Sequence, residues 1–225
     1  QGLSDPPHKG QSKEDLLETI RRLGFVQVDS INTVARAHHQ ILFSRNATYR
    51  EKNLKRLVEA DCHLFENWTH DASIIPSEFF PYWRRRFARE EARLQKRYEA
   101  WQGSPFLHEC DGILDRIARD GPVMTRDFEG EKPSTGWWDW HPSKMALEYL
   151  WRTGRLAIAR RDGFQKVYDL AERVIPGHCH ASEVEHHDFV DWACRSALSR
   201  LGFATRGEIA AFWDLLKPDE VAAWI

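Results

Sequence analysis

The chain has 225 residues, which is enough for one large domain or for two or three small domains with buried cores. Hydrophobic residues make up 42% of it and charged residues 29%, which excludes large-scale disorder, and no run approaches the roughly 18 apolar residues that a membrane span requires. The formal net charge of −2 excludes a protein that is basic over its whole surface.

A winged helix is predicted for residues 1–76. The periodicity of leucine and isoleucine predicts a first helix that is capped by Ser12 and stopped at Gly24. Two more helices and two short extended segments follow, an order typical of a helix-turn-helix with a wing. The expected ranges are helices 12–23, 31–45 and 50–59, a strand within 62–68, and the motif W-T-H-D-A-S-I-I-P at 68–76.

The segment between the first two of these helices contains an amide and a carboxylate that can act together. In an extended chain, side chains two residues apart point the same way, so Gln27 and Asp29 would lie next to each other with Val28 turned into the core. The alternative is that Asp29 or Ser30 caps a helix beginning near Ile31, which typically stabilises a helix by about 1 kcal/mol. Residue types alone leave both interpretations open.

Residues 77–104 are predicted to form one long connecting helix. Aromatic residues and leucine recur at helical spacing from Phe80 to Trp101 and predict its buried face. The outer face is basic, so it is either a solvated surface or a ridge that contacts phosphates, with Arg84 and Arg85 as candidate DNA contacts. The basic residues assigned to this outer face are Arg84, Arg85, Arg86, Arg89, Arg93, Lys96 and Arg97.

A second winged helix is predicted for residues 105–177. A first helix ends near Gly121, a second helix spans 142–153, and Asp162-Gly163 marks the turn of a two-stranded hairpin. Basic residues cluster near the tip of this hairpin, where a wing would contact a DNA backbone. They are Arg160, Arg161 and Lys166.

A partial third winged helix is predicted for residues 178–225, with helices at 182–201 and 205–216. The sequence Arg-Leu-Gly-Phe ends a predicted helix at 22–25 and again at 200–203, which supports repeated units. From residue 178 onward, eight acidic side chains outnumber four basic ones. Any contact with nucleic acid is therefore expected in the earlier part of the chain.

The sequence does not favour a metal site, a hydrolytic triad or a nucleotide-binding site. Neighbours in the His- and Cys-rich segment 178–187 rarely converge on one zinc ion. His70, Asp71 and Ser73 are too close in sequence for a triad, and there is no glycine-rich phosphate loop. We therefore expect no metal and no cofactor. The four cysteines form no C-x-x-C pair, so we expect free thiols in a cytoplasmic protein.

The stretch L-G-F-V-Q-V-D-S at 23–30, together with the motif at 68–76, resembles the YcaQ/AlkZ-type DNA glycosylases. These are winged-helix proteins that remove alkylated bases and unhook interstrand crosslinks. In that family a Gln-hydrophobic-Asp or Gln-hydrophobic-Gln triplet is catalytic, so the resemblance implies catalytic roles for Gln27 and Asp29. His70 and Ser73 match the second motif, which usually has Glu where this chain has Asp71.

The resemblance spans most of the chain and implies further site residues after the triplet and in a tryptophan-containing segment leading to Lys144. The family also begins with one more helix and continues into a C-terminal β-barrel. We therefore expect a sequence truncated at both ends, with Phe212, Trp213 and Trp224 left uncovered. The substrate or DNA contacts expected from this comparison are Arg36, His38, His39, Arg45, His70, Ser73 and Lys144.

The expected fold class is mainly α with short β-hairpins, arranged as tandem winged helix-turn-helix units. The expected function is that of a monomeric, monofunctional DNA glycosylase acting in the bacterial cytoplasm, at the nucleoid, on double-stranded DNA with N7-alkylpurines or crosslinks. Asp29 would stabilise an oxocarbenium-like sugar while Gln27 holds the attacking water. The alternatives are a non-enzymatic winged-helix DNA-binding protein or transcriptional regulator, and a protein-interaction scaffold.

Overall fold

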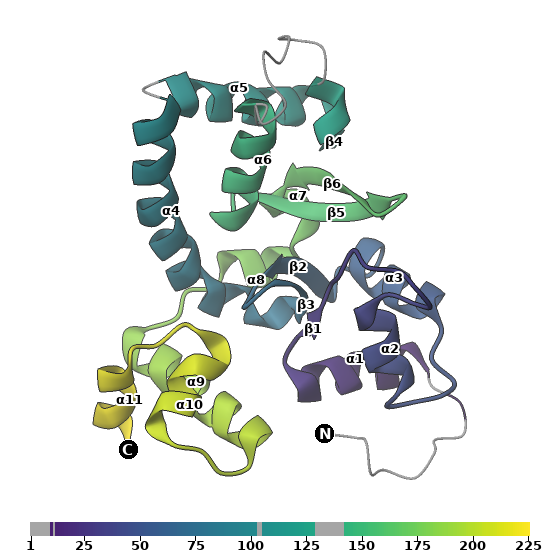
Figure 1. Ribbon diagram of the computed structural model, residues 1–225, viewed down its shortest axis with the longest axis vertical. Coiled ribbons are helices and arrows are strands. Elements are labelled where there is room, and N and C mark those ends of the chain that lie inside the picture. The colour runs from purple at the N-terminus through teal and green to yellow at the C-terminus, as the bar shows by residue number, and fades with distance from the viewer. Residues whose placement is uncertain (1–9, 11, 103–104, 129–141) are drawn as a thin grey trace. The chain divides into compact units, whose positions relative to one another are not determined.

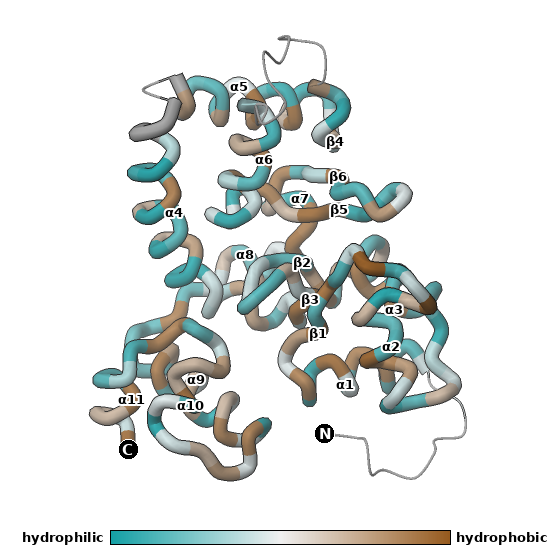
Figure 2. Tube along the Cα trace, viewed as in Figure 1, coloured by the Kyte–Doolittle hydropathy of each residue, from teal (hydrophilic) through white to brown (hydrophobic). Residues whose placement is uncertain are grey.

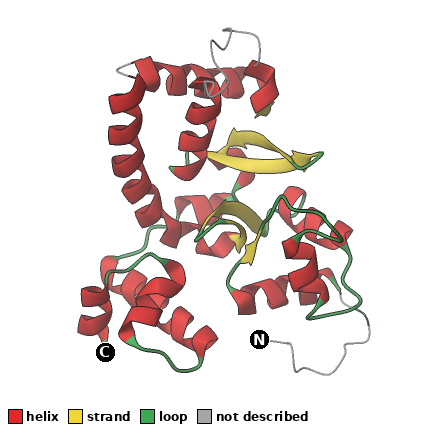
Figure 3. Cartoon of the chain, viewed as in Figure 1, coloured by secondary structure: helices red, strands yellow, loops and turns green. Residues whose placement is uncertain are grey.

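The computed structural model describes residues 10, 12–102, 105–128 and 142–225. The protein is mainly helical and contains two three-stranded antiparallel sheets, which confirms the predicted fold class (Figures 1 and 3). It divides into two compact units. The first unit contains the residues up to Tyr82 together with Ala181–Ile225, and the second is Trp83–His180. Within the described residues, no helix is long and apolar enough to cross a membrane.

The first unit begins with α1 (Lys13–Leu23), which forms as predicted. Ser12 Oγ accepts the Asp15 N–H at 3.1 Å and Asp15 Oδ2 accepts the Ser12 N–H at 2.9 Å, so two free donors of the helix start are satisfied. The helix ends at Gly24, whose φ of +89° suits glycine and whose N–H donates to Ile20 O.

The second helix starts later than the sequence predicts. Helix α2 spans Ala37–Phe43, with Arg36 at its N-cap position, and α3 spans Glu51–Glu59. The expected start at Ile31 is therefore wrong. Residues 31–34 are all exposed, including Val34 at 91%, so a helix beginning there would have no apolar face to bury.

The first sheet has the strand order β1-β3-β2, formed by β1 (Val26–Gln27), β2 (Leu64–Trp68) and β3 (Ala72–Pro76). The antiparallel register pairs Val26 with Ile74 and Gln27 with Ser73. Beyond the strand, the Val28 N–H still donates to Ala72 O at 2.7 Å. The order helix, strand, two helices, hairpin is that of the predicted winged helix.

The C-terminal helices α9 (His186–Leu201), α10 (Arg206–Trp213) and α11 (Pro218–Trp224) complete the first unit. Thr205 and Glu208 form the capping box of α10. No strand occurs in residues 178–225, all of which the structure describes. Trp213 is only 1% exposed, and its ring lies 5.4 Å from that of Trp192. The expectation of an uncovered aromatic surface is therefore wrong for Trp213, which belongs to the core of this unit, whereas Phe212 and Trp224 are half-buried.

Helix α4 (Phe80–Gln102) runs from the end of the first unit into the second, after the short 3-10 helix η1 (Ser77–Phe79). Apolar and polar residues recur along it as predicted (Figure 2). Its apolar residues Phe80, Trp83, Phe87 and Leu94 are buried. Arg86 and Glu90 are buried as well, at 4% and 6% exposure. Arg86 is therefore not part of the basic outer face to which the sequence pattern assigns it.

The second unit repeats the order of elements found in the first. Helix α5 is followed by strand β4, a helical turn η2, helix α6 and the hairpin β5–β6, and the sheet order is β4-β6-β5. Gly163 and Phe164 both have positive φ, so they form the hairpin turn, one residue later than the predicted Asp-Gly pair. The bounds are α5 Pro105–Asp120, β4 Val123–Met124, η2 Thr125–Phe128, α6 Pro142–Arg152, β5 Leu156–Asp162, β6 Gln165–Leu170, α7 Ala171–Val174 and α8 Gly177–Ala181.

Gly24 and Gly202 allow a matched test of packing at the end of α1. Both end a helix with positive φ, so alanine strains the backbone by about 1–2 kcal/mol at either position. At Gly24 a Cβ would also lie 2.6 Å from Trp213 Cη2, whereas nothing lies within 4 Å at Gly202. We expect Gly24→Ala to lower the free energy of unfolding by about 1–3 kcal/mol more than Gly202→Ala in urea denaturation. Equal losses would show that Trp213 does not pack against Gly24.

Candidate functional site

The predicted triplet lies at the end of β1, and its side chains alternate as an extended chain requires. Gln27 is exposed, Val28 is 6% exposed and Asp29 is half-buried. The Nε2 of Gln27 donates to Asp71 Oδ2 at 3.3 Å, from the turn between β2 and β3. Gln27, Asp29 and Asp71 together form what we call the β1 site.

Asp29 is held by the backbone through one of its two carboxylate oxygens. Oδ1 accepts the Ile31 N–H at 2.9 Å, which closes a turn and does not cap a helix. Among the described residues, Oδ2 has no hydrogen-bond partner. The carboxylate is therefore fixed in direction and keeps one oxygen for a ligand or a water molecule.

Asp71 determines which way the amide of Gln27 faces. Its Oδ1 accepts the Ala72 N–H at 2.8 Å, and its Oδ2 accepts from Gln27. Because a carboxylate only accepts hydrogen bonds, the NH₂ group of Gln27 must face Asp71. The Oε1 of Gln27 then faces away from Asp71 as a hydrogen-bond acceptor. The site consequently contains acceptor oxygens from Gln27 and Asp29.

Two residues expected to contact substrate or DNA are buried. Ser73 is 0% exposed, and its hydroxyl lies 2.8 Å from Thr69 Oγ1 and donates to Asp71 O at 3.1 Å. His38 is 6% exposed. Neither side chain reaches the surface, so the expectation of direct DNA contact does not fit them. Ser73 instead stabilises the turn that presents Asp71.

His70 is exposed in the same turn, but its imidazole contacts protein. Its Nε2 lies 3.0 Å from the backbone oxygen of Phe212 in α10. A carbonyl oxygen can only accept, so the proton of this hydrogen bond is on Nε2. His70 therefore joins the β2–β3 turn to the C-terminal helices.

Helix α2 packs beside β1 and contributes the histidine pair. The rings of His38 and His39 lie 4.1 Å apart, and His39 Nδ1 lies 2.8 Å from the Tyr49 hydroxyl. Burial lowers the pKa of His39, opposed by Glu51, whose carboxylate lies 3.5 Å from Nε2. Burial, helped by Glu51, raises the pKa of Tyr49. A neutral His39 whose Nδ1 accepts the proton of the Tyr49 hydroxyl fits both the lowered pKa of His39 and the raised pKa of Tyr49.

The remaining expected contact of this segment, Arg45, lies at the end of α2 and bonds the backbone. Its Nη1 donates to Ile41 O at 2.8 Å, and Arg36 supplies the N-cap backbone of the same helix. Arg36 and Arg45 therefore flank the two ends of the helix that packs beside β1.

The His39 environment leads to a pH prediction. A histidine whose folded pKa is depressed stabilises the fold above its unfolded value of 6.5, and this contribution is lost as pH falls below that value. Because Glu51 raises the pKa of His39, Glu51→Gln should lower it further and increase the loss of stability at acid pH. An imidazole NMR titration measures this pKa, with Glu59→Gln on the same helix as the control. A higher pKa in Glu51→Gln would contradict the arrangement.

In the second unit, the basic side chains of the hairpin differ in the partners they bind. Lys166 donates to Glu148 at 2.9 Å and lies 3.6 Å from the centre of the Trp151 ring. Arg161 donates to Phe164 O at 2.6 Å across the turn. Lys166 and Arg161 thus stabilise the hairpin, and their contact with a DNA backbone stays a prediction. Arg160 is the more exposed cation of the hairpin, at 46%, and its Nε lies 3.3 Å from Asp162.

The other expected contacts of this unit are on helices. Arg84 and Arg85 of α4 are both exposed. Arg84 also donates to His180 O within the second unit. Lys144 is exposed on α6. The tryptophan-containing segment at 137–141 that precedes it lies outside the described residues.

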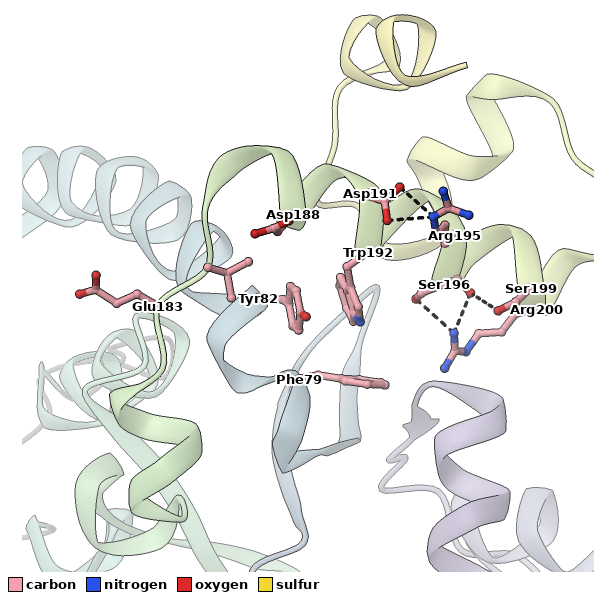
Figure 4. Close-up of a pocket in the computed structure, with 11 residues that line it drawn as sticks. Phe79, Tyr82, Glu183, Asp188, Asp191, Trp192, Arg195, Ser196, Ser199 and Arg200 are labelled. Atoms are coloured by element: carbon pink, nitrogen blue, oxygen red, sulfur yellow. Dashed lines mark hydrogen bonds and ion pairs between the residues drawn. The ribbon is translucent and has the colours of Figure 1, made fainter.

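The structure contains an open cavity of about 750 Å³ in the first unit, and its lining includes none of the residues of the β1 site (Figure 4). Tyr82 and Trp192 stack at 3.9 Å on its wall, and three carboxylates also line it. Arg195 and Arg200 line it too, and none of the residues expected to contact DNA is among its lining, so the cavity is not the expected DNA site. Within the described part of the chain, no three His, Cys, Asp or Glu side chains are grouped to hold a metal ion.

A family model described as DNA glycosylase AlkZ-like matches residues 20–225, which include the whole β1 site. The chain belongs to the AlkZ-like DNA glycosylase family. It is also similar in structure to the Streptomyces sahachiroi DNA glycosylase AlkZ, with a TM-score of 0.58 and 16% identity. That match covers 99% of this chain and 61% of the other, so the chain spans about three fifths of that protein's length. At this identity, the structural match establishes a shared fold.

Sequence reasoning on this AlkZ-like chain proposed Gln27 and Asp29 as catalytic residues and named Asp71 within the motif at 68–76, but it did not foresee the bond between Asp71 and Gln27. It also missed other residues that hold the site. Glu51 and Tyr49 belong to a segment with no recognisable motif, and Phe212 contacts His70 through its backbone, which carries no signal in the sequence.

Proposed function

We propose that the chain is a monofunctional DNA glycosylase that hydrolyses the N-glycosidic bond of N7-alkylated purines in double-stranded DNA, including those in interstrand crosslinks. Membership of the AlkZ-like DNA glycosylase family supports this reaction class. One structural observation carries the proposal. Asp29 is fixed by the backbone with one oxygen free, two residues along the chain from Gln27, whose amide Asp71 orients.

The chemistry of the bond explains why one carboxylate suffices. An N7-alkylated purine is already cationic, so it can leave without a proton donor. The sugar then develops oxocarbenium character, and a negative charge near C1′ stabilises this transition state more than the ground state. Asp29 supplies that charge through the oxygen that the backbone leaves free.

Gln27 and Asp29 can also position the water that attacks C1′. A water molecule that donates its hydrogens to Gln27 Oε1 and Asp29 Oδ2 directs an oxygen lone pair away from both groups. Asp71 contributes by holding the NH₂ group of Gln27 on its own side, which keeps Oε1 as the acceptor. Water hydrolysis leaves an abasic site and uses no covalent intermediate with the enzyme.

Asp29→Asn tests the reaction directly. Loss of the negative charge should slow the release of N7-methylguanine from duplex DNA by about 10²–10³-fold, and Gln27→Ala by about 10²-fold, while circular dichroism and DNA affinity stay near those of the unmodified chain. Single-turnover assays with alkaline cleavage at abasic sites measure these rates. Undiminished release by Asp29→Asn would exclude the assignment, and DNA binding without release by the unmodified chain would support a non-enzymatic DNA-binding protein.

The hairpin of the second unit allows a separate test of DNA contact. If Arg160 contacts a phosphate, Arg160→Ala should weaken binding and reduce the slope of log K against log salt by about 0.9. Lys166→Met should leave that slope unchanged, because the Lys166 ammonium is already paired with Glu148. Fluorescence anisotropy across a range of salt concentrations measures both slopes. Equal slopes for Arg160→Ala and the unmodified chain would remove Arg160 from the interface.

A further inference from the structure

We propose that α10 positions the β1 site, and that His70 acts as a positioning residue for Gln27 and Asp29 without contacting DNA. This inference rests on the proposed function. Two segments determine where Gln27 lies, namely the chain that enters β1 at Phe25 and the β2–β3 turn that carries Asp71. The same helix, α10, contacts both of them.

The entrance to β1 is held by aromatic packing. The ring of Phe25 lies 6.1 Å from that of Phe212 and 5.9 Å from that of Trp213. Trp213 is almost fully buried, and its indole N–H donates to Ser196 Oγ at 2.8 Å, so the ring cannot turn freely. Gly24 lies so close to this ring that a Cβ would overlap with it. The position of residues 24–26 is therefore set by α10.

The end of α1 is held by an arginine from the C-terminal helices. Arg200 Nη2 donates to Arg21 O at 2.6 Å, and its Nη1 donates to Ser196 O at 2.7 Å, as the bonds to Ser196 in Figure 4 show. The Arg21 carbonyl is one of the last in α1, where carbonyl oxygens lack an N–H donor from the helix itself. A guanidinium at a helix C-terminus is also favoured by the helix dipole.

The β2–β3 turn is held by His70. The bond from Nε2 to Phe212 O fixes the residue next to Asp71, and Asp71 fixes the amide of Gln27. Both segments contact the same residue of α10, Phe212. Its ring contacts Phe25 at the entrance to β1, and its carbonyl oxygen accepts from His70 in the β2–β3 turn. A small displacement of α10 therefore moves both segments that set the position of Gln27.

The substitutions His70→Gln and His70→Asn separate positioning from DNA contact. Glutamine places its Nε2 donor where the imidazole Nε2 lies, whereas the shorter asparagine cannot reach Phe212 O. Both remove the imidazole equally, and His70 is exposed, so neither should prevent folding. We expect His70→Asn to slow single-turnover base release by about tenfold with DNA affinity within about twofold, and His70→Gln to retain most of the rate.

A readout that does not depend on activity distinguishes failure of this inference from failure of the proposed function. In His70→Asn, the Val28 N–H, which donates to Ala72 O, should exchange faster with solvent, and the Gln27 side-chain amide resonances should shift. In His70→Gln both should stay close to those of the unmodified chain. If His70→Gln and His70→Asn weaken DNA binding equally, or if neither changes the exchange rate of the Val28 N–H, the positioning role is overturned. Absence of base release in the unmodified chain would instead reject the proposed function.

Discussion

The antiparallel pairing of β1 with β3 is the interaction on which the proposed site depends. It places Gln27 opposite Ser73 and next to the turn that carries Asp71, so that an amide and a carboxylate separated by 44 residues can bond. Side chains alternate along a strand, so a register shift of one residue would bury Gln27 and expose Val28. The buried Val26 and Val28 prevent this shift, because both would lose their places in the core. The hydrophobic residues on either side of Gln27 therefore help to hold its amide in the position where it bonds Asp71.

The sequence predicts the features that local rules determine. The capping boxes at Ser12 and Thr205, the helix ends at Gly24 and Gly202 and the position of the second hairpin follow from residues only a few positions apart. The start of α2 does not, because apolar residues such as Val34 mimic a helical face, and only the tertiary structure shows that nothing covers them. The same limit applies to Trp213, because two of the residues it packs against, Gly24 and Phe25, come from the other end of the chain.

Charge raises a different difficulty. A sequence gives the number and position of basic residues, but not which of them are already neutralised within the protein. Lys166 and Arg160 are close in the sequence and belong to one hairpin, yet only Lys166 is enclosed between a carboxylate and an indole ring. Arg86 shows the same effect on α4, where a residue of an apparently solvated basic run is buried. A count of cations therefore overestimates the surface available to phosphates.

The first unit is discontinuous in the sequence, and this affects how the chain folds during synthesis. Arg21 and its partner Arg200 are separated by 179 residues, which a ribosome takes roughly 10–35 s to add at about 5–20 residues per second. The second unit is continuous and has time to fold in that interval. Until α10 emerges, Phe25 lacks its aromatic partners, so the nascent chain exposes an incomplete apolar surface next to β1. This surface is therefore open to chaperones that bind apolar segments for as long as the C-terminal helices are not yet made.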